Sequence, residues 1–396
     1  MKREIGDLRL FGGPPAFLHT LYVGEPNTGD RDRFFDRLAW ALDNRWLTNG
    51  GPLLREFEER VAELAEVRNA VATCNATAGL HLLIHGCGLT GEIIMPALTF
   101  VATAHAVRWL GLQPVFCDID PATGCLHPAQ VEAAITPHTT GIIGVHLWGR
   151  PCPADELEKI AAGNSLILLF DAAHALGCTY REQRIGGFGA AEVFSFHATK
   201  VAHSFEGGAI TTNNDELAQR LRAMRNFGLN QDGVVEALGT NAKMSEAAAA
   251  MGLTSLDAFS RAVVHNRVNY ELYRCELDGV AGVQMISYDE QESNNYHYLV
   301  IEVDEGICGL GRDLLREVLR AENVVAQRYF HPGCHQMEPY RSERTVTLPH
   351  TERLSARVLA LPTGPGVSRE DIRRVCDIVR IAVTHGVEVT ARWRQS

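Results

Sequence analysis

Short apolar runs alternate with longer amphipathic stretches through the first two thirds of the chain. The runs are bounded by Gly, Pro, Asn or Asp, as is typical of strands buried on both faces of a parallel sheet. Between them, apolar residues recur with the spacing of one helix face. The predicted strands are 70–73, 93–96, 113–118, 140–145, 166–171 and 192–196. The predicted helices are 34–42, 53–64, one ending near 85, 98–110, 128–135, 215–227 and 247–256.

This alternation predicts an α/β protein with a mostly parallel sheet and helices on both of its faces. The pattern changes near Leu256, where a long helix to Leu277 leads to a strand at 295–303 and a helix at 311–321. We therefore predict a smaller α+β domain at the carboxyl end. The domain organisation that follows is an N-terminal arm and first helix at 1–50, a large domain at 51–256 and a small domain at 257–396.

The composition of the chain argues against several classes of protein. The chain has 396 residues, is 46% hydrophobic and 21% charged, and carries a net charge of -11, which argues against a nucleic-acid surface. It shows no apolar run long enough for a membrane span and no signal-peptide pattern at its amino terminus. The ten cysteines are scattered without a CxxC pair, and no HExxH metal motif occurs. We therefore expect a cytoplasmic protein with reduced thiols, no membrane partner and no metal.

Candidate chemistry gathers between Leu166 and Ile210. The apolar run 166–170 ends on Asp171, and the run 192–196 leads through His197-Ala198-Thr199 to Lys200. Ligands bind beyond the carboxyl ends of strands in open α/β sheets. An acid, a lysine and a hydroxyl at neighbouring strand ends fit a pyridoxal phosphate site, where the lysine bonds the cofactor aldehyde and the acid keeps the ring nitrogen protonated. Taken alone, the two residues also fit a surface lysine and a helix N-cap.

The residues around Asp171 and Lys200 favour the cofactor site. The segments Asp171-Ala172-Ala173-His174-Ala175, Phe194-Ser195-Phe196-His197-Ala198-Thr199-Lys200 and Glu206-Gly207-Gly208 closely resemble the DegT/DnrJ/EryC1/StrS family of sugar aminotransferases. Matches run along nearly the whole chain. The resemblance implies a fold-type-I, pyridoxal-phosphate-dependent transferase, with Lys200 and Asp171 as its catalytic residues. A branch of dehydratases in this family carries His where this chain has Lys200, so the lysine favours aminotransfer.

A strand that turns into a helix through Cys74-Asn75-Ala76-Thr77 offers free amide groups to a phosphate. A simple strand-to-helix turn is the alternative. The family usually has Ser-Gly-Thr here, so the resemblance places Ala76 and Thr77 at the cofactor phosphate. Alanine at position 76 disfavours the positive φ that a glycine would allow.

The resemblance supplies the remaining cofactor contacts. It implies that Phe100 stacks on the cofactor ring, that His174 touches the ring or its hydroxyl side, and that Ser195 binds the phosphate. It also implies that Asn241, in Gly239-Thr240-Asn241, reaches the phosphate of the neighbouring subunit. A homodimer with shared active sites follows. As alternatives, Phe100 is a core residue and Asn241 caps its own chain.

The family implies transfer of an amino group from L-glutamate to a nucleotide-linked keto sugar. Where the stretches 75–77 and 243–246 depart from the common pattern, they resemble family members that act at C4, which implies an NDP-4-keto-6-deoxyhexose aminated at C4. Three alternatives stay open: amination of a 3-keto sugar at C3, amination of a keto-cyclitol, and a cofactor-binding regulatory protein without turnover.

Overall fold

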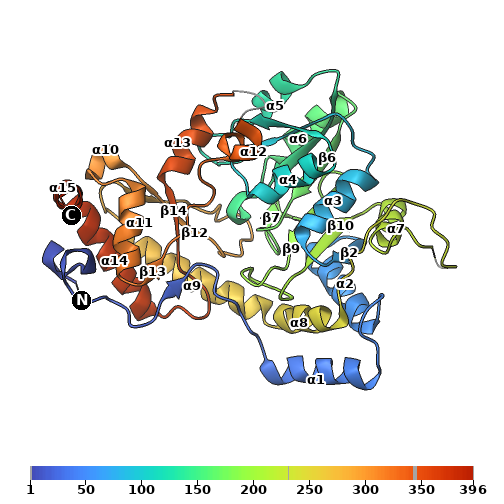
Figure 1. Ribbon diagram of the computed structural model, residues 1–396, viewed down its shortest axis with the longest axis horizontal. Coiled ribbons are helices and arrows are strands. Elements are labelled where there is room, and N and C mark those ends of the chain that lie inside the picture. Colours follow the sequence, from blue (N-terminus) through green and yellow to red (C-terminus); the bar gives the residue numbers. More distant parts are fainter. Residues whose placement is uncertain (1, 231, 342–345, 396) are drawn as a thin grey trace.

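The larger unit of the molecule is built on a seven-stranded sheet with helices on both faces (Figure 1). A computed structural model describes residues 2–230, 232–341 and 346–395. The strands, in spatial order, are β2 (Asn69–Thr73), β10 (Gly208–Thr212), β9 (Ala191–Ser195), β6 (Ile167–Asp171), β5 (Thr139–Val145), β3 (Glu92–Pro96) and β4 (Gln113–Cys117). Only β10 runs antiparallel to its neighbours within this sheet. The prediction of an α/β protein with a mostly parallel sheet is confirmed.

Each strand of this sheet buries side chains on both faces. In β3, Ile94 enters one core, whereas Ile93 and Met95 enter the core on the opposite face, because successive strand residues point to opposite sides. This explains why the strands appear in the sequence as mainly apolar runs, without a regular alternation of apolar and polar residues. One core is closed by α2 (Pro52–Ala65), α5 (Pro128–Ala134), α6 (Ala154–Gly163) and α8 (Glu246–Asp257), and the other by α3 (Ala76–Gly86), α4 (Val101–Trp109) and α7 (Asp215–Met224).

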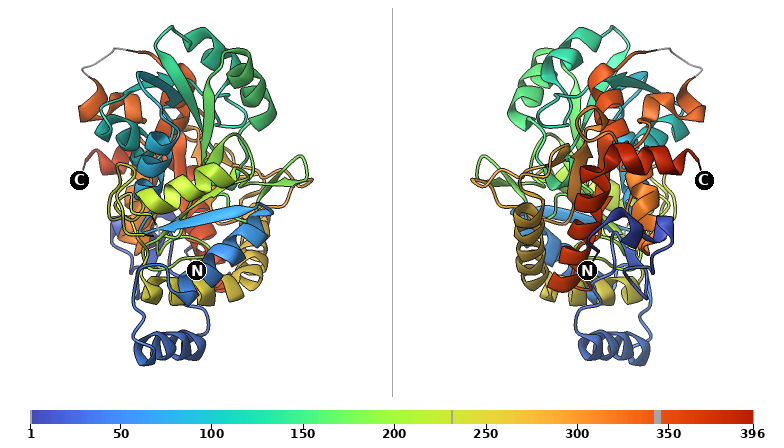
Figure 2. Two further views of the ribbon diagram at one scale, coloured as in Figure 1. Left: turned by 90° about the vertical axis from the view of Figure 1, so that its right-hand side faces the viewer. Right: turned by 90° about the vertical axis from the view of Figure 1, so that its left-hand side faces the viewer.

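The smaller unit is an antiparallel three-stranded sheet packed against helices (Figures 1 and 2). Its strands are β11 (Val283–Met285), β12 (Leu299–Val303) and β14 (Val358–Leu361). Its principal helices are α11 (Arg312–Ala321) and α14 (Arg369–Thr384), with the shorter α10 (Glu305–Cys308) and α15 (Gly386–Trp393). Two further short helices of the C-terminal region, α12 (Glu338–Arg341) and α13 (Pro349–Arg357), instead place Tyr340 and Leu354 in the cores of the larger unit. A short hairpin, β7 (Thr179–Tyr180) with β8 (Gln183–Arg184), follows β6. No helix in the described ranges combines the length and the apolar character that crossing a membrane requires.

The helix α9 (Phe259–Leu277) joins the two units. Its first turns place Phe259 and Ala262 in the core of the larger unit, and its last turns place Tyr273 and Leu277 in the core of the smaller one. The helix is separated from α8 by the single residue Ala258. The single helix α9 therefore connects the two cores.

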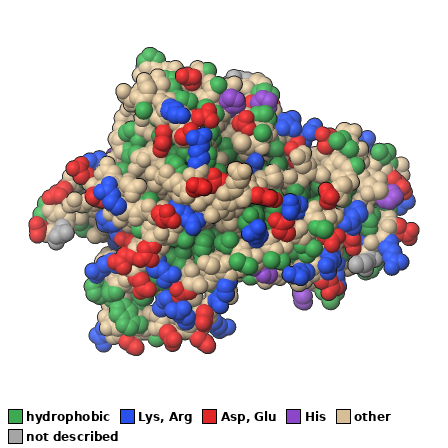
Figure 3. All heavy atoms as spheres, turned by 180° about the vertical axis from the view of Figure 1, so that it is seen from behind, with side chains coloured by type: hydrophobic (Ala, Val, Ile, Leu, Met, Phe, Trp, Pro, Cys, Tyr) green, Lys and Arg blue, Asp and Glu red, His purple; other side chains and the backbone are tan. Residues whose placement is uncertain are grey.

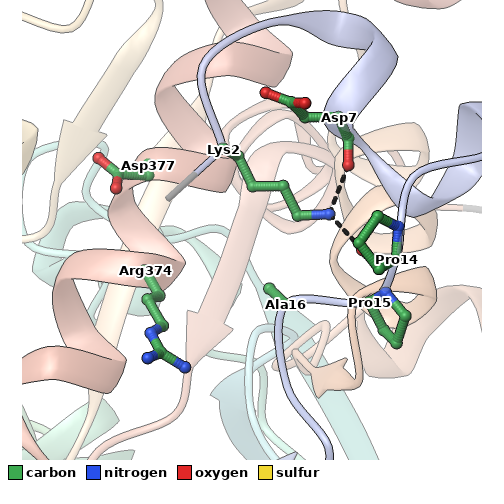
Figure 4. A pocket seen from close by; sticks show the side chains of 7 residues that line it. All are labelled: Lys2, Asp7, Pro14, Pro15, Ala16, Arg374 and Asp377. Atoms are coloured by element: carbon green, nitrogen blue, oxygen red, sulfur yellow. Dashed lines mark hydrogen bonds between the residues drawn. The ribbon is translucent and has the colours of Figure 1, made fainter.

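The first residues of the chain belong to the core of the smaller unit. Ile5, Leu8 and Phe17 pack there with residues of the C-terminal helices, and β1 (Leu21–Tyr22) pairs in parallel with β13 (Val324–Val325). Figure 4 shows Lys2 pointing toward the backbone of Asp7 and Pro14, beside a cavity that α14 borders. The Lys2 ammonium also lies 2.9 Å from the buried Glu322 carboxylate. The amino-terminal segment is therefore fastened to the C-terminal unit, while α1 (Arg31–Asp43) projects beyond it (Figure 1).

Three predicted boundaries are wrong for identifiable reasons. The strand predicted from Asn295 begins only at Leu299, because Tyr296 adopts a positive φ and the Asn295 amide donates to two backbone carbonyls instead of continuing a ladder. The helix predicted to run to Phe227 ends at Met224, since Phe227 also has a positive φ. The helix predicted from residue 98 begins at 101, after an extended residue 100.

Candidate active site

A cavity of about 260 Å³ opens at the carboxyl ends of β6 and β9. These two strands are hydrogen-bonded neighbours and run parallel, so the residues that follow them meet at one edge of the sheet. The structure brings seven of the eight predicted site residues together around this cavity. They are Ala76, Thr77, Phe100, Asp171, His174, Ser195 and Lys200.

Asp171 is the last residue of β6 and is almost fully buried. One carboxylate oxygen accepts a hydrogen bond of 2.7 Å from the Thr103 hydroxyl, and the other accepts the Ala173 N–H at 3.1 Å. Burial raises the pKa of Asp171, although these two hydrogen bonds and the charge of Lys200 oppose the shift. The site therefore fixes the carboxylate in place and favours a cationic partner for it.

Lys200 follows β9 and extends its ammonium group into the cavity. Burial lowers the pKa of Lys200 to about 8, while the Asp171 carboxylate opposes the shift. Its Nζ atom donates a hydrogen bond of 2.8 Å to the Tyr298 hydroxyl. A lysine with its pKa lowered by burial has a larger neutral fraction near physiological pH than an ordinary lysine, and the neutral amine is the form that a nucleophile or a proton acceptor requires.

The start of α3 forms one wall of the cavity. Asn75 caps this helix by accepting the Ala78 N–H at 2.8 Å, and Ala76 and Thr77 are the first two helical residues, whose N–H groups have no acceptor within the helix. No positive φ occurs at Ala76, so alanine suits the geometry. A Cβ on Gly208 would lie 2.6 Å from the Ala76 nitrogen. The glycine therefore lets β10 pass directly beside this helix terminus.

Aromatic rings close the cavity on the side facing the smaller unit. Phe330 lies between two predicted site residues: its ring centroid is 5.8 Å from that of His174, with the planes nearly parallel, and 5.9 Å from that of Phe100. Phe100 is about half exposed, so it is not a core residue. His174 accepts the Trp148 N–H on Nδ1, and burial holds its pKa well below the usual value. The neutral His174 ring therefore carries its proton on Nε2.

Asn241 lies outside this cavity. Its side chain is exposed, and its backbone forms an isolated bridge with Asn226. Ser195, in contrast, lines the cavity, and its hydroxyl oxygen accepts the His197 N–H. The predicted role of Asn241 in the site of a partner subunit stays a prediction.

Sequence reasoning missed several residues of the cavity. Thr103 lies on α4, one helical turn after Phe100, and this spacing could have indicated it. Tyr298 lies in a segment expected to be strand, so its direction could not be foreseen. Tyr329 and Phe330 lie beyond the predicted helix 311–321, in a part of the chain where the sequence pattern predicts no element. Glu206 and His197 flank the opening, with 3.5 Å between carboxylate and imidazole.

The residues present fit pyridoxal phosphate. The N–H groups at the start of α3 suit a phosphate, the buried Asp171 suits the ring nitrogen, and Lys200 is the amine for the aldehyde. The described residues contain no cluster of three or more metal ligands. A fold with these groups at the ends of its central strands is that of a pyridoxal-phosphate-dependent enzyme of fold type I.

The comparison with known proteins gives the family. The sequence model of the DegT/DnrJ/EryC1/StrS aminotransferase family matches residues 29–380, so the chain belongs to this family. It is 32% identical over 366 residues to dTDP-4-amino-4,6-dideoxy-D-glucose transaminase of Escherichia coli, covering 91% of this chain and 98% of the relative. It is likewise 32% identical to GDP-perosamine synthase of Caulobacter vibrioides, covering 90% and 97%.

Solved structures agree with this assignment. A crystal structure of DesI in the presence of its TDP-sugar product superposes with a TM-score of 0.96 at 58% identity, covering 98% of this chain and 100% of the other. PseC of Helicobacter pylori, an aminotransferase of pseudoaminic acid biosynthesis, superposes with a TM-score of 0.86 at 25% identity, covering 91% and 99%. The chain is thus a sugar aminotransferase, which replaces the alternative of a regulatory protein without turnover.

Proposed function

We propose that this enzyme transfers an amino group from L-glutamate to C4 of a 4-keto-6-deoxyhexose linked to a nucleoside diphosphate. The observation that carries the proposal is the full-length similarity, at 58% identity, to a protein crystallised with a TDP-sugar product. The name of the Escherichia coli relative places the amino group on C4 of a 4,6-dideoxy sugar. L-Glutamate as donor rests on the family resemblance.

When bound, pyridoxal phosphate supplies an electron sink and carries the amino group between donor and acceptor. The chain's own residues supply binding, orientation and proton transfer. The buried Asp171 carboxylate would hold a proton on the ring nitrogen, and Lys200, as a neutral amine, would move a proton at the substrate carbon. The amides of Ala76 and Thr77 bind the phosphate and so anchor the group.

The product should carry its new nitrogen on C4. We expect the loaded enzyme to convert an NDP-4-keto-6-deoxyhexose and L-glutamate to the 4-amino sugar, because a ketone moved to the next carbon shifts the reacting atom by about a bond length or two and loses most of the rate. NMR of the isolated product measures the position. Matched reactions with the 3-keto isomer and with a free keto-cyclitol serve as controls.

Two results would contradict this substrate assignment in different ways. A product with its nitrogen on C3 and an unreacted C4 ketone would show that the proposed position of amination is wrong, while the nucleotide sugar would remain the substrate class. Turnover of the cyclitol alone would replace the substrate class. A loaded enzyme that accepts an amino group from another amino acid and not from L-glutamate would change only the donor.

The second part of the proposal is a homodimer with shared sites. In the part of the chain that the structure describes, Lys200 is the only lysine or arginine that lines the cavity, which also holds the acidic Asp171 and Glu206. A diphosphate and the carboxylates of glutamate need further donors or cations. The projecting helix α1 carries exposed Phe35, Trp40 and Leu42, and Figure 3 shows hydrophobic side chains on the surface of this projecting part of the molecule. An apolar surface of this kind favours contact with a second copy.

Mixed dimers test the shared site. An Asn241→Ala chain mixed with a Lys200→Ala chain forms dimers in which one site carries both defects and the other carries neither, provided that Asn241 acts across the interface. We expect inactive parents and recovery of about a quarter of the wild-type activity after random mixing. The rate of turnover after verified subunit exchange is the measurement. Inactive parents without recovery would place Asn241 in its own chain's site, and a fully active Asn241→Ala parent would place it outside the reaction.

A further inference from the structure

The hydrogen bond between Tyr298 and Lys200 crosses from one unit of the molecule to the other. Lys200 follows β9 of the larger unit, whereas Tyr298 directly precedes β12 of the smaller one. The Tyr298 oxygen lies 2.8 Å from the lysine Nζ. The tyrosine side chain is buried and lines the same cavity as the lysine. The contact is therefore part of the site, and it ends on the atom that has to react.

The phenol is held in place without any help from the lysine. The Tyr288 hydroxyl donates to the Tyr298 carbonyl at 2.7 Å and accepts the Tyr298 N–H at 3.3 Å, which fixes the backbone. The Tyr298 ring packs against His174, with 4.5 Å between ring centroids, and against Tyr329 at 6.0 Å. Its oxygen consequently stays at the same position when Lys200 moves.

A neutral phenol can serve both forms of the amine. Burial raises the pKa of Tyr298 well above its usual value, so the phenol keeps its proton. Toward an ammonium the oxygen accepts a hydrogen bond, and toward a neutral amine the hydroxyl donates one. The charged form gains more, since hydrogen bonds to charged groups are the stronger ones.

We propose that Tyr298 is the positioning residue for Lys200: it holds the lysine amine in the cavity whenever that amine is not bonded to the cofactor, and it stabilises its protonated form. The role builds on the assignment of Lys200 as the reacting lysine and does not depend on which sugar the enzyme uses. A tyrosine fixed in the smaller unit thereby sets the location of a proton carrier in the larger one.

The test measures the titration of Lys200 in the cofactor-free protein. The amines are allowed to react with trace acetic anhydride between pH 6 and 10, and peptide mapping gives the extent of acetylation at each lysine. In the wild type the midpoint for Lys200 should lie near 8. In Tyr298→Phe we expect it about one pH unit lower, because the ammonium loses its acceptor. Lys159, which is largely exposed, is the internal reference and should not shift.

A matched substitution separates this role from a general change of the cavity. Tyr329→Phe removes a hydroxyl from the same cavity, but Lys200 donates to Tyr298, so the midpoint should stay at its wild-type value. In the cofactor-loaded enzyme without sugar, Tyr298→Phe should lower the maximal single-turnover rate constant with L-glutamate about tenfold and change the glutamate concentration that gives half of this rate less than about twofold.

Identical Lys200 midpoints in the wild type and in folded Tyr298→Phe would overturn the proposal. A downward shift in Tyr329→Phe as large as that in Tyr298→Phe would also overturn it. If Tyr298→Phe does not fold, 3-fluorotyrosine at position 298 keeps the volume of the side chain and weakens its oxygen as an acceptor. With this replacement the Lys200 midpoint should fall by less than the shift expected for Tyr298→Phe, and an unshifted midpoint would overturn the proposal. Because these titrations need neither cofactor nor sugar, their outcome is independent of the substrate assignment.

Discussion

Lys200→Ala should lose about 10⁴-fold in the rate of transamination, the largest effect we expect from any single substitution in this chain. The reason is that one amine serves both as the covalent anchor of the cofactor and as the proton carrier at the substrate carbon. Peptide mapping after borohydride reduction of the loaded wild type should find the reduced cofactor on Lys200, because reduction makes that bond permanent.

The exposed Lys159 provides the matched control for this prediction. Lys159→Ala removes a lysine from a surface ion pair with Asp155, whose energetic contribution is small, and should retain the wild-type rate. A borohydride label on a lysine other than Lys200, or wild-type turnover in Lys200→Ala, would show that the reacting amine has been misassigned.

Asp171→Asn should reduce the rate by about 10³-fold, which corresponds to about 4 kcal/mol of transition-state stabilisation. The substitution keeps the size of the side chain and an oxygen for the Thr103 hydroxyl, but it removes the negative charge that holds a proton on the ring nitrogen. We expect the variant to fold and to bind the cofactor. Single-turnover rates measured by absorbance, with L-glutamate as donor, check the prediction.

A second acid at the end of a strand in the same sheet supplies the control. Asp118 follows β4, and its carboxylate accepts the N–H groups of His350 and Thr351 at the start of α13. Asp118→Asn weakens a helix cap, so it should lower the free energy of unfolding by about 1 kcal/mol and leave the rate unchanged. Equal losses of rate in Asp118→Asn and Asp171→Asn would mean that any buried acid of this sheet is required.

The elements predicted best are those whose side chains are buried on both sides. The strand ending at Asp171 and the strand before Lys200 could be recognised because each is a short apolar run between turn residues. Their adjacency followed from the order of strands in a parallel sheet, and the structure places them side by side. The helix start at Ala76 could also be predicted, because it depends only on a strand that turns into a helix through small residues.

What could not be predicted depends on contacts between distant segments. Nothing around Tyr298 indicates that its hydroxyl meets Lys200, because the direction of the side chain is set by a positive φ at Tyr296 and by the carbonyls that Asn295 binds. The same holds for Phe330, whose position between Phe100 and His174 results from packing across the two units. Periodicity in the sequence predicts an element and the residues next to it. It does not predict contacts between segments that lie far apart in the chain.

The attachment of the amino-terminal segment to the C-terminal unit has a consequence for synthesis of the protein. Ile5, Leu8 and Phe17 leave the ribosome about three hundred residues before the strand β13 and the helices that bury them. At usual rates of translation this separation lasts roughly 15 to 60 seconds. During that time the larger sheet can form, while these apolar side chains remain on a nascent chain with nothing to cover them. The part of the protein made first is thus among the last to be buried.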